Sequence, residues 1–271
     1  MGAIVGGYAT SHTMFPSVGV ESQAATVVAG FEEIGSRIRE AGADVVLLVS
    51  SEHGPTLPPS GPQPAFVVGT GESIRTFGEM GVPKTSFSGH PDFARGFVRH
   101  ASTAGFDLAT VERFQADHGT AIPVLKMFPD LDIPIVPMIV NSLVEEATAT
   151  AARCHQLGKV LADYAASRPE RVAVVGCGGL SHWPGTPDMG RINEEFDRDF
   201  LTLLENGGGG EAATWSTDYI REHAGNGGLE IRNWILVSGA VGDRPGRSLY
   251  YEPIPQWVTG MGAFEFDVAA V

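Results

Sequence analysis

Four histidines and one glutamate, spread from residue 12 to residue 230, occur in short settings that could each present a side chain to a ligand. They are His12, His53, His118, His182 and Glu230. Two histidines and one carboxylate around an open metal position form the ligand set of non-haem Fe(II) oxygenases. Two further histidines beside such a site would supply proton transfer. The wide spacing predicts an iron site that the fold assembles from distant segments, and not from one local motif.

The settings of three histidines point to chain segments that leave a strand. His12 and His53 each follow an apolar run and precede a segment that breaks the chain direction, Thr13-Met14-Phe15-Pro16 in one case and Gly54-Pro55 in the other. Loops at strand ends often carry functional residues. His182 follows Gly178-Gly179, where the lack of a side chain lets the backbone pass close to a ligand. These settings favour a functional interpretation.

Each of the five residues also has an ordinary structural explanation. A glycine-rich turn can carry His182 by chance, and the neighbouring Asp117 need not contact His118. Glu230 stands near the start of a predicted helix over 230–241, where a glutamate commonly complements the helix dipole. A lone histidine is usually structural, and we interpret four others in this way: His90, His100, His155 and His223. The chemical interpretation therefore depends on the five residues in combination.

The composition is that of a globular protein with little attraction for polyanions. Hydrophobic residues make up 43% of the 271 residues and charged residues 18%, which is enough for a core and excludes a disordered chain. The net charge of −14 and the lack of a basic run make nucleic acids and anionic membranes poor partner candidates. No signal peptide or bilayer-spanning run is apparent. We therefore expect a cytoplasmic protein in which Cys154 and Cys177 are reduced thiols.

Apolar runs alternate with amphipathic patterns along the chain. Continuous apolar runs, typical of central strands covered on both faces, predict strands over 3–7, 44–50, 133–140 and 171–176. Helical periodicity predicts helices over 24–41, 90–104, 145–166 and 230–241. The alternation predicts a single α/β domain over residues 1–271, with a central mixed sheet flanked by helices. Ligands bind beyond the carboxyl ends of strands in such sheets, so we expect the active site at strand ends. The four-glycine run 207–210 predicts a mobile surface turn.

The order of these motifs resembles a known family. Ser11-His12, Glu52-His53, Asp117-His118-Gly119, Gly178-Gly179-Leu180-Ser181-His182 and Glu230-Ile231-x-x-Trp234 are similar to the class III extradiol ring-cleavage dioxygenases. This is the superfamily of the protocatechuate 4,5-dioxygenase beta subunit. Within it, a closer likeness is to the 2,3-dihydroxyphenylpropionate 1,2-dioxygenases, through residues 64–69, Phe77-Gly78 and residues 250–257. The resemblance spans nearly the whole chain.

The resemblance implies a role for each of the five residues. His12, His53 and Glu230 are implied as ligands of an Fe(II) cofactor, His182 as the catalytic base and His118 as the second active-site histidine. The implied reaction is extradiol (meta) cleavage of a catechol-type ring with O2, in aromatic catabolism. The sequence departs from the pattern in two ways. The segment between His182 and Glu230 is shorter than in the dihydroxyphenylpropionate enzymes, and Glu52 stands where an aspartate is usual. Both departures bear on the substrate more than on the chemistry.

The residues themselves say less about the substrate. A catechol must lose protons to bind a metal through both oxygens, and a histidine can accept one of them. We expect a carboxylated catechol, although the 18 Lys and Arg residues show no recognisable frame for a carboxylate. Protocatechuate, gallate, an aminophenol and a hydroxypyridone stay open as alternatives, and the substrate-binding residues are unknown. Phe15, Trp183 and residues 250–257 are candidates for the pocket walls, with plain core as the ordinary alternative.

Two other classes of function stay open on the residues alone. Two histidines and a glutamate also bind catalytic zinc, so His12, His53 and Glu230 would suit a zinc-dependent hydrolase. The third possibility is a non-catalytic subunit on the same fold, but all five matched positions are filled, which argues against it. We expect a homo-oligomer, and the resemblance leaves open a small separate partner subunit.

Overall fold

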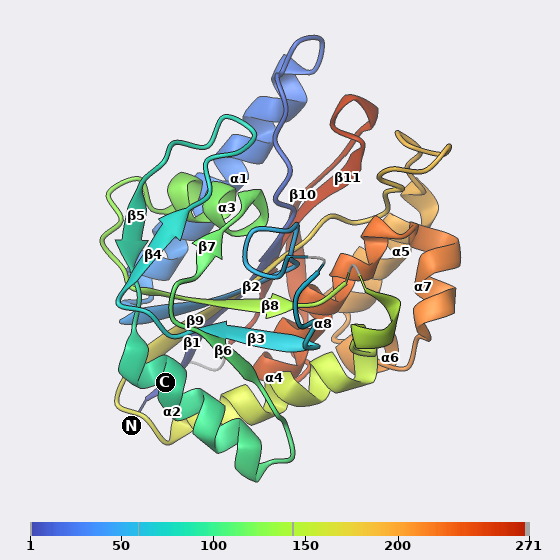
Figure 1. The fold of residues 1–271 in the computed structure, drawn as a ribbon. Coiled ribbons are helices and arrows are strands. Elements are labelled where there is room, and N and C mark those ends of the chain that lie inside the picture. The colour runs from blue at the N-terminus through green and yellow to red at the C-terminus, as the bar shows by residue number, and fades with distance from the viewer. Residues whose placement is uncertain (1, 59, 143, 269–271) are drawn as a thin grey trace.

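The computed structural model describes residues 2–58, 60–142 and 144–268 and is built around an eight-stranded sheet (Figure 1). The strand order is β10-β11-β1-β9-β2-β8-β3-β6. The middle strands β1, β9, β2 and β8 are parallel, whereas β11 pairs antiparallel with β1, and β3 antiparallel with β8. The mixed central sheet flanked by helices confirms the predicted fold class. A small second sheet has the order β5-β4-β7.

The strands are short and most are buried. In chain order they are β1 (Ala3–Thr10), β2 (Val45–Ser50), β3 (Phe66–Gly69), β4 (Ser73–Thr76), β5 (Ser86–Ser88), β6 (Ala109–Val111), β7 (Gln115–Ala116), β8 (Ile135–Val140), β9 (Arg171–Cys177), β10 (Gly246–Ile254) and β11 (Thr259–Phe266). The helices are α1 (Glu21–Glu40), α2 (Pro91–Thr103), α3 (His118–Met127), α4 (Ala151–Ala166), α5 (Glu194–Glu205), α6 (Gly209–Ala212), α7 (Thr217–Ala224) and α8 (Ile231–Val241). Single 3-10 turns are η1 (Glu145–Ala147), η2 (Gly227–Glu230) and η3 (Pro255–Trp257).

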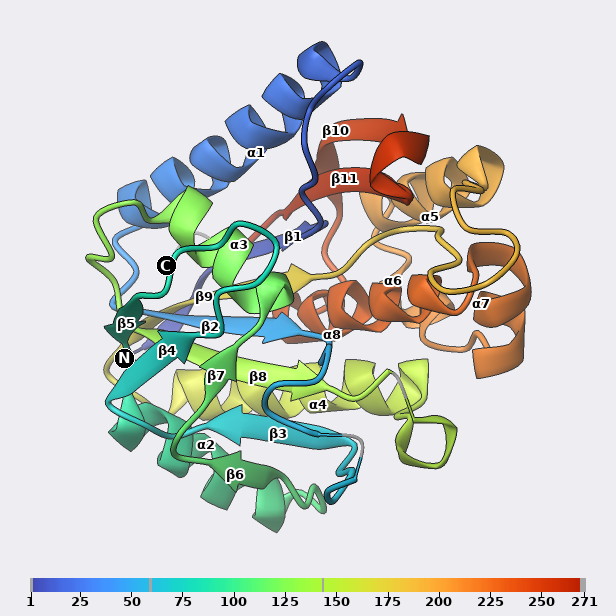
Figure 2. The same ribbon diagram turned by 45° about the horizontal axis from the view of Figure 1, so that its top comes forward.

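Two hydrophobic cores lie on the two faces of the sheet, because successive strand residues point to opposite sides. Leu47 of β2 joins the core under α2, α4 and α8, whereas its neighbours Val46 and Leu48 join the core under α1 and α3. All three are fully buried. Burial of an aliphatic side chain of this kind stabilises the fold by about 1.5–3 kcal/mol. Figure 2 shows α1 and α3 on the upper side of the sheet, whereas α2 and α4 pass behind β8, β3 and β6.

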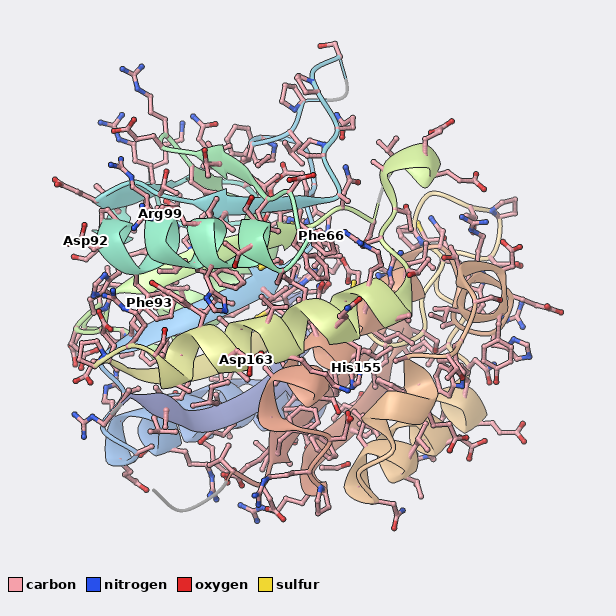
Figure 3. All side chains as sticks on the ribbon, turned by 90° about the horizontal axis from the view of Figure 1, so that it is seen from below. Phe66, Asp92, Phe93, Arg99, His155 and Asp163 are labelled. Carbon is pink, nitrogen blue, oxygen red and sulfur yellow. The ribbon has the colours of Figure 1, made fainter. Side chains whose placement is uncertain are left out.

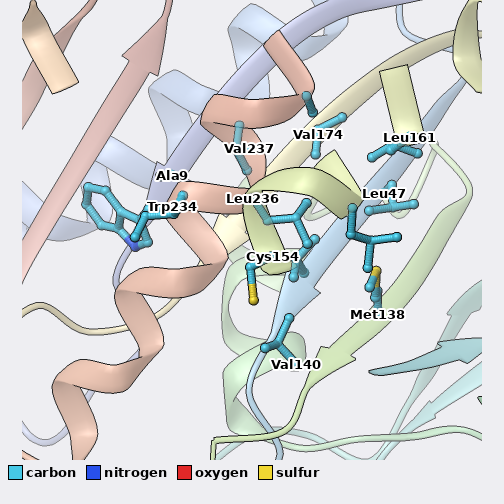
Figure 4. Close-up of a cluster of buried hydrophobic side chains, with 14 of the residues drawn as sticks. Ala9, Leu47, Met138, Val140, Cys154, Leu161, Val174, Trp234, Leu236 and Val237 are labelled. Carbon is cyan, nitrogen blue, oxygen red and sulfur yellow. The ribbon is translucent and has the colours of Figure 1, made fainter. Parts of the chain in front are cut away.

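The core under α2, α4 and α8 is filled by side chains from neighbouring strands and helices. In Figure 3, α2 and α4 cross this face, with Phe93 buried and Asp92 and Arg99 exposed on the outer side of α2. Figure 4 shows Leu47 and Val174 of the sheet near Leu236 of α8 within the same buried cluster. Packing on both faces explains why the central strands are continuous apolar runs.

The predicted strands are all present, and the predicted helices differ from the observed ones in two ways. Helix 145–166 is divided into η1 and α4, because the chain is extended at Thr148 and Thr150. The helices α3, which contains Pro123, α5, α6 and α7 were not predicted.

Of the predicted surface turn over 207–210, Gly207 and Gly208 do lie in a turn, but Gly209 and Gly210 are helical. Gly209 begins α6 and is buried, and a Cβ at this position would collide with Ser238 Oγ of α8. The glycines therefore allow close packing. Within the described part of the chain, no helix is long and apolar enough to cross a membrane.

Candidate active site

Three of the candidate histidines follow three neighbouring parallel strands. His12 follows β1, His182 follows β9 and His53 follows β2, and the sheet order places β9 between the other two. The register pairs Thr10 with Cys177, so the carboxyl ends of β1 and β9 are level. Parallel strands that end together present their following loops at one edge of the sheet. The three histidines therefore reach one place from distant parts of the sequence, as predicted.

Glu230 reaches the same edge from the junction of η2 and α8. The helix α8 lies against β9 so closely that a Cβ at Gly178 would be 2.6 Å from the Glu230 Cβ. Trp234 Nε1 of α8 donates a hydrogen bond to the Gly178 carbonyl (3.0 Å), and the Gly179 amide donates to Glu230 Oε2 (2.7 Å). The glycine pair noted in the sequence thus lets the helix approach and fixes the carboxylate.

The five predicted residues converge on one small volume. Around the Glu230 carboxylate, His53 Nε2 lies 3.3 Å from Oε1, and His12 Nε2 and His182 Nε2 lie 3.6 and 3.8 Å from Oε2. The ring centroid of His118 is 4.1 Å from that of His53 and 5.5 Å from that of His12. Glu230 is only 4% exposed and His12 only 1%. The arrangement is a buried carboxylate enclosed by imidazole nitrogens.

The charges of this cluster are strongly coupled. Burial opposes the charged form of Glu230, but His12, His53 and His182 outweigh it and hold the pKa of the carboxyl well below its usual range. Burial lowers the pKa of His12 to about 3 despite the nearby carboxylate. Burial also opposes charge on His53, yet its bonds to Asp117 and Glu230 raise its pKa well above the ordinary value. The site therefore combines an anionic carboxylate with a neutral His12.

His53 and His118 are each oriented by a carboxylate that binds the Nδ1 atom of the ring. Asp117 Oδ2 accepts from the His53 amide (2.8 Å) and binds His53 Nδ1 (2.9 Å). Its other oxygen accepts from the Thr120 amide and caps α3. Glu79 Oε1 likewise accepts from the His118 amide (3.0 Å) and binds its Nδ1 (2.7 Å). This leaves Nε2 of His53 facing Glu230 at 3.3 Å, and Nε2 of His118 outside the contact with Glu79.

His182 is held by the backbone and by a buried polar network next to it. Its Nδ1 lies 2.8 Å from the Leu180 carbonyl, which can only accept, so Nδ1 carries the proton and Nε2 has a free lone pair. The preceding Ser181 donates to Asp197 through its amide and its hydroxyl, each at 2.8 Å. Tyr251 donates to the same carboxylate (2.8 Å). Asp197 thus anchors the loop that carries His182.

Glu52 organises the loop after β2 and explains how the unusual residue at this position is accommodated. Its Oε1 accepts from the Gly54 amide (2.8 Å) and the Thr56 amide (2.9 Å). The side chain is buried, and burial raises the pKa of its carboxyl. These two bonds fold the turn that holds His53. They engage Glu52 Oε1 with the backbone of its own loop and not with the cluster of histidines.

The donor atoms fit a divalent ion of the first transition row. Donors bound at about 2.0–2.2 Å to one such ion lie roughly 3–3.6 Å apart, which matches the distances of His12 and His53 from Glu230. These distances involve Nε2 of His12, whereas its Nδ1, on the other side of the ring, is buried and has no hydrogen-bond partner among the described residues.

The geometry contains a second possible ligand set. Ring nitrogens of His12, His53 and His118 lie within 4.8 Å of one another. The rings of His53 and His118, however, are tilted by only 38° at a centroid distance of 4.1 Å, which is a stacking contact. His12 and His53 meet edge to face at 5.1 Å, so they can direct nitrogens at a shared ion. His12 and His53 are common to both sets, and the third ligand is either Glu230 or His118.

Sequence reasoning missed three carboxylates that support the histidines. Asp117 was noted only as a neighbour of His118, yet it binds His53. Glu79 lies 39 residues before His118, and Asp197 lies 16 residues after Ser181. No sequence motif connects these partners, because the contacts depend on how distant loops meet in the fold.

The remaining candidates occupy ordinary structural positions. His90 caps α2 through a bond from the Phe93 amide, and His155 of α4 binds Asp243 at 2.6 Å. Among the proposed pocket walls, Trp257 is fully buried and Tyr250 is 9% exposed, and both belong to the hydrophobic core under α1. Both are therefore core residues, which was the ordinary alternative to a place in the pocket walls. Phe15, which is 39% exposed, stays available to a ligand.

The fold and the cluster define an α/β protein with a histidine-rich candidate metal centre at its strand ends. Residues 6–262 match the family described as the catalytic LigB subunit of aromatic ring-opening dioxygenase, and the chain belongs to this family. This confirms the resemblance to the extradiol dioxygenases and supports ring-opening dioxygenase chemistry.

Characterised relatives and a solved structure agree with this membership. A 2,3-dihydroxyphenylpropionate/2,3-dihydroxicinnamic acid 1,2-dioxygenase of Rhodococcus jostii is 26% identical, covering 91% of this chain and 94% of the relative. An enzyme of the same name from Paraburkholderia xenovorans is 29% identical, covering 74% and 77%. The crystal structure of an uncharacterized protein of Escherichia coli K12 shares the fold, with a TM-score of 0.66 at 17% identity, covering 96% of this chain and 98% of that one.

The Asp197 network generates a pH prediction. Burial raises the pKa of Asp197 from 3.8 to about 6, so the folded state holds the proton more tightly than the unfolded state. The associated stability is complete below pH 3.8 and is lost as the pH rises through about 6. Relative to Asp197→Asn, the wild-type free energy of unfolding should fall across this window by up to about 3 kcal/mol, or roughly two units at 1.4 kcal/mol each. Urea unfolding of both proteins between pH 4.5 and 7.5 measures the difference, and a pH-independent difference would contradict the prediction.

Proposed function

We propose that the protein is an Fe(II)-dependent extradiol dioxygenase that cleaves a catechol-type ring with O2. The observation that carries the proposal is the buried Glu230 carboxylate with imidazole nitrogens at 3.3, 3.6 and 3.8 Å. Burial of this anion without a cation would be costly. Family membership gives the reaction class, and the relatives that act on dihydroxyphenyl acids give the catechol.

We assign the metal ligands to His12, His53 and Glu230. This set is preferred over the three histidines because it neutralises part of the ion's charge with a buried carboxylate that is already anionic. It is also the facial arrangement of two histidines and one carboxylate that leaves open positions for substrate and O2. Asp117 supports it by holding His53 with Nε2 free, since ligand histidines commonly donate their other ring nitrogen to a carboxylate.

Bound Fe(II) would hold the diol and O2 and supply the redox chemistry. The chain's own residues would handle the protons. His182 Nε2 carries a lone pair and faces the carboxylate end of the site, so it accepts a proton from one substrate hydroxyl. A Cβ at Gly227 would collide with the His182 ring, so this glycine leaves room for the base. His118, which stacks on His53, provides the second group for proton delivery.

A carboxylated side chain is the substituent that we propose for the substrate. Support comes from Arg191, the basic residue of the loop that follows His182. Its guanidinium lies 4.5 Å from the ring centroid of Trp183, directly after His182, and its side chain is 54% exposed. An exposed guanidinium stacked on an aromatic ring can still bind a carboxylate. Trp183 would then form part of the pocket wall.

The ligand assignment predicts a clear division among the five residues. His12→Ala and His53→Ala should lose most bound Fe(II), because each removes a ligand. His182→Ala should keep near-normal iron while its turnover falls by about 10²–10⁴-fold, the usual contribution of a general base. Metal analysis after anaerobic reconstitution, together with O2 uptake on a catechol, measures both quantities.

A matched histidine control separates these effects from general damage. His155→Ala removes a buried histidine that binds Asp243 and not this cluster, so its iron content and turnover should resemble the wild type. The assignment is wrong if the His12 and His53 variants retain iron and activity, and loss of iron in His182→Ala would make that residue a ligand.

The substrate proposal predicts a preference in kcat/KM for carboxylated catechols over catechol itself. Arg191→Ala should reduce that preference by weakening binding of the acid only. Arg198→Ala is the control, because Arg198 is similarly exposed and stacked 4.7 Å from the Tyr251 ring. Equal use of catechol and its acids by the wild type would remove the acid claim. No turnover of any vicinal diol or aminophenol would remove the dioxygenase proposal.

A further inference from the structure

We propose that Glu79 is a positioning residue for His118, and that the loop from Phe77 to Val82 is thereby part of the active site. The catalytic consequence rests on the proposed function, whereas the pairing itself does not. Neither the sequence motifs nor the family resemblance involve Glu79 in this role.

The contact has a specific form that occurs twice in the site. One oxygen of Glu79, Oε1, receives both the His118 amide (3.0 Å) and His118 Nδ1 (2.7 Å). One oxygen of Asp117, Oδ2, receives the His53 amide (2.8 Å) and His53 Nδ1 (2.9 Å) in the same way. Two bonds from one residue to one oxygen fix the rotation of the imidazole as well as its position. The pair of bonds that holds His53, a proposed metal ligand, thus also holds His118, a proposed proton-transfer group.

The small sheet brings Glu79 to His118. Strands β4 and β7 are parallel, and the register pairs Thr76 with Ala116. The Phe77 amide then donates to the Ala116 carbonyl (2.8 Å), so the chain after β4 and the chain after β7 leave the sheet side by side. Glu79 follows the first and His118 follows the second. Their contact therefore depends on a strand pair that is separate from the large sheet carrying His12, His53 and His182.

The backbone around Glu79 is held in an uncommon conformation. Gly78, Met80 and Gly81 have φ values of 86°, 50° and 77°. For Met80 this left-handed conformation is strained and persists only where surrounding contacts enforce it. The Val82 amide closes the turn onto the Glu79 carbonyl at 2.8 Å. The loop thus directs one carboxylate inward while Phe77 and Met80 stay 46% and 37% exposed.

The consequence for His118 is a defined tautomer. A carboxylate only accepts hydrogen bonds, so Nδ1 carries the proton and Nε2 keeps its lone pair. One ring nitrogen of His118 lies within 4.8 Å of ring nitrogens of His12 and His53. Nε2 is then the atom that exchanges protons with a substrate bound beside those residues. Without Glu79 the ring can rotate or place its proton on Nε2, and either change removes the free lone pair from the site.

The test compares Glu79→Ala, Glu79→Gln and the control Glu72→Ala in the full-length protein. Glu72 is an exposed acidic residue just before β4, so the control changes the net charge by the same amount. Glu79→Ala should lower kcat by about 10–100-fold, the usual effect of losing a partner of an active-site histidine, with KM and iron content unchanged. Glu79→Gln keeps an oxygen acceptor and should recover part of the loss. In a His118→Asn background, Glu79→Ala should cause no further loss.

A second readout does not depend on activity. Nitrogen-15 NMR of the full-length protein without added metal, assigned with His118→Asn, should show His118 protonated at Nδ1 in the wild type and in Glu72→Ala, and a changed signal in Glu79→Ala. An unchanged His118 signal in Glu79→Ala, equal losses of kcat with and without His118, or loss of iron would each overturn the positioning role. If the wild type cleaves no diol or aminophenol, the proposed function fails, and the NMR comparison alone then decides the pairing.

Discussion

The burial of one carboxylate among imidazole rings is the constraint on which the rest of the site depends. Glu230 is 4% exposed, and the groups that face it are histidine nitrogens and the Gly179 amide. An anion in this position is tolerated only if positive charge or strong hydrogen bonds compensate for the loss of water. The same requirement explains Gly178, which lets α8 approach, and it explains why the surrounding histidines are held so firmly.

The supporting carboxylates form an outer layer around the histidines. Asp117 holds His53 and caps α3, Glu79 holds His118, and Asp197 holds the loop that ends at His182. Each comes from a different element, so the rings of His53 and His118 are oriented from outside and the loop that carries His182 is anchored. His12 is the exception, because its Nδ1 has no partner among the described residues. A bound ion would therefore contribute most to the order of His12.

The convergence of the candidate residues could be predicted because strand ends have a clear sequence signal. Apolar runs such as 44–50 end directly before His53, and parallel strands in an α/β fold present such residues together. The family resemblance then assigned a role to each of them.

The helix α3 was missed because Pro123 and the short apolar segment obscure its periodicity. Glu79 and Asp197 could not be predicted, since no spacing rule relates them to His118 and Ser181. The second half of the four-glycine run was misinterpreted because glycine permits both loose turns and close packing, and only the contact of Gly209 with α8 distinguishes them.

The most direct test of the central claim is the position of the metal. Crystals loaded anaerobically with Fe(II) and measured at the iron absorption edge locate the ion by its anomalous signal. Our account predicts a peak about 2.0–2.3 Å from His12 Nε2, His53 Nε2 and the Glu230 carboxylate, with His118 and His182 outside the coordination sphere. A peak bound to His12, His53 and His118, with Glu230 beyond bonding distance, would contradict it.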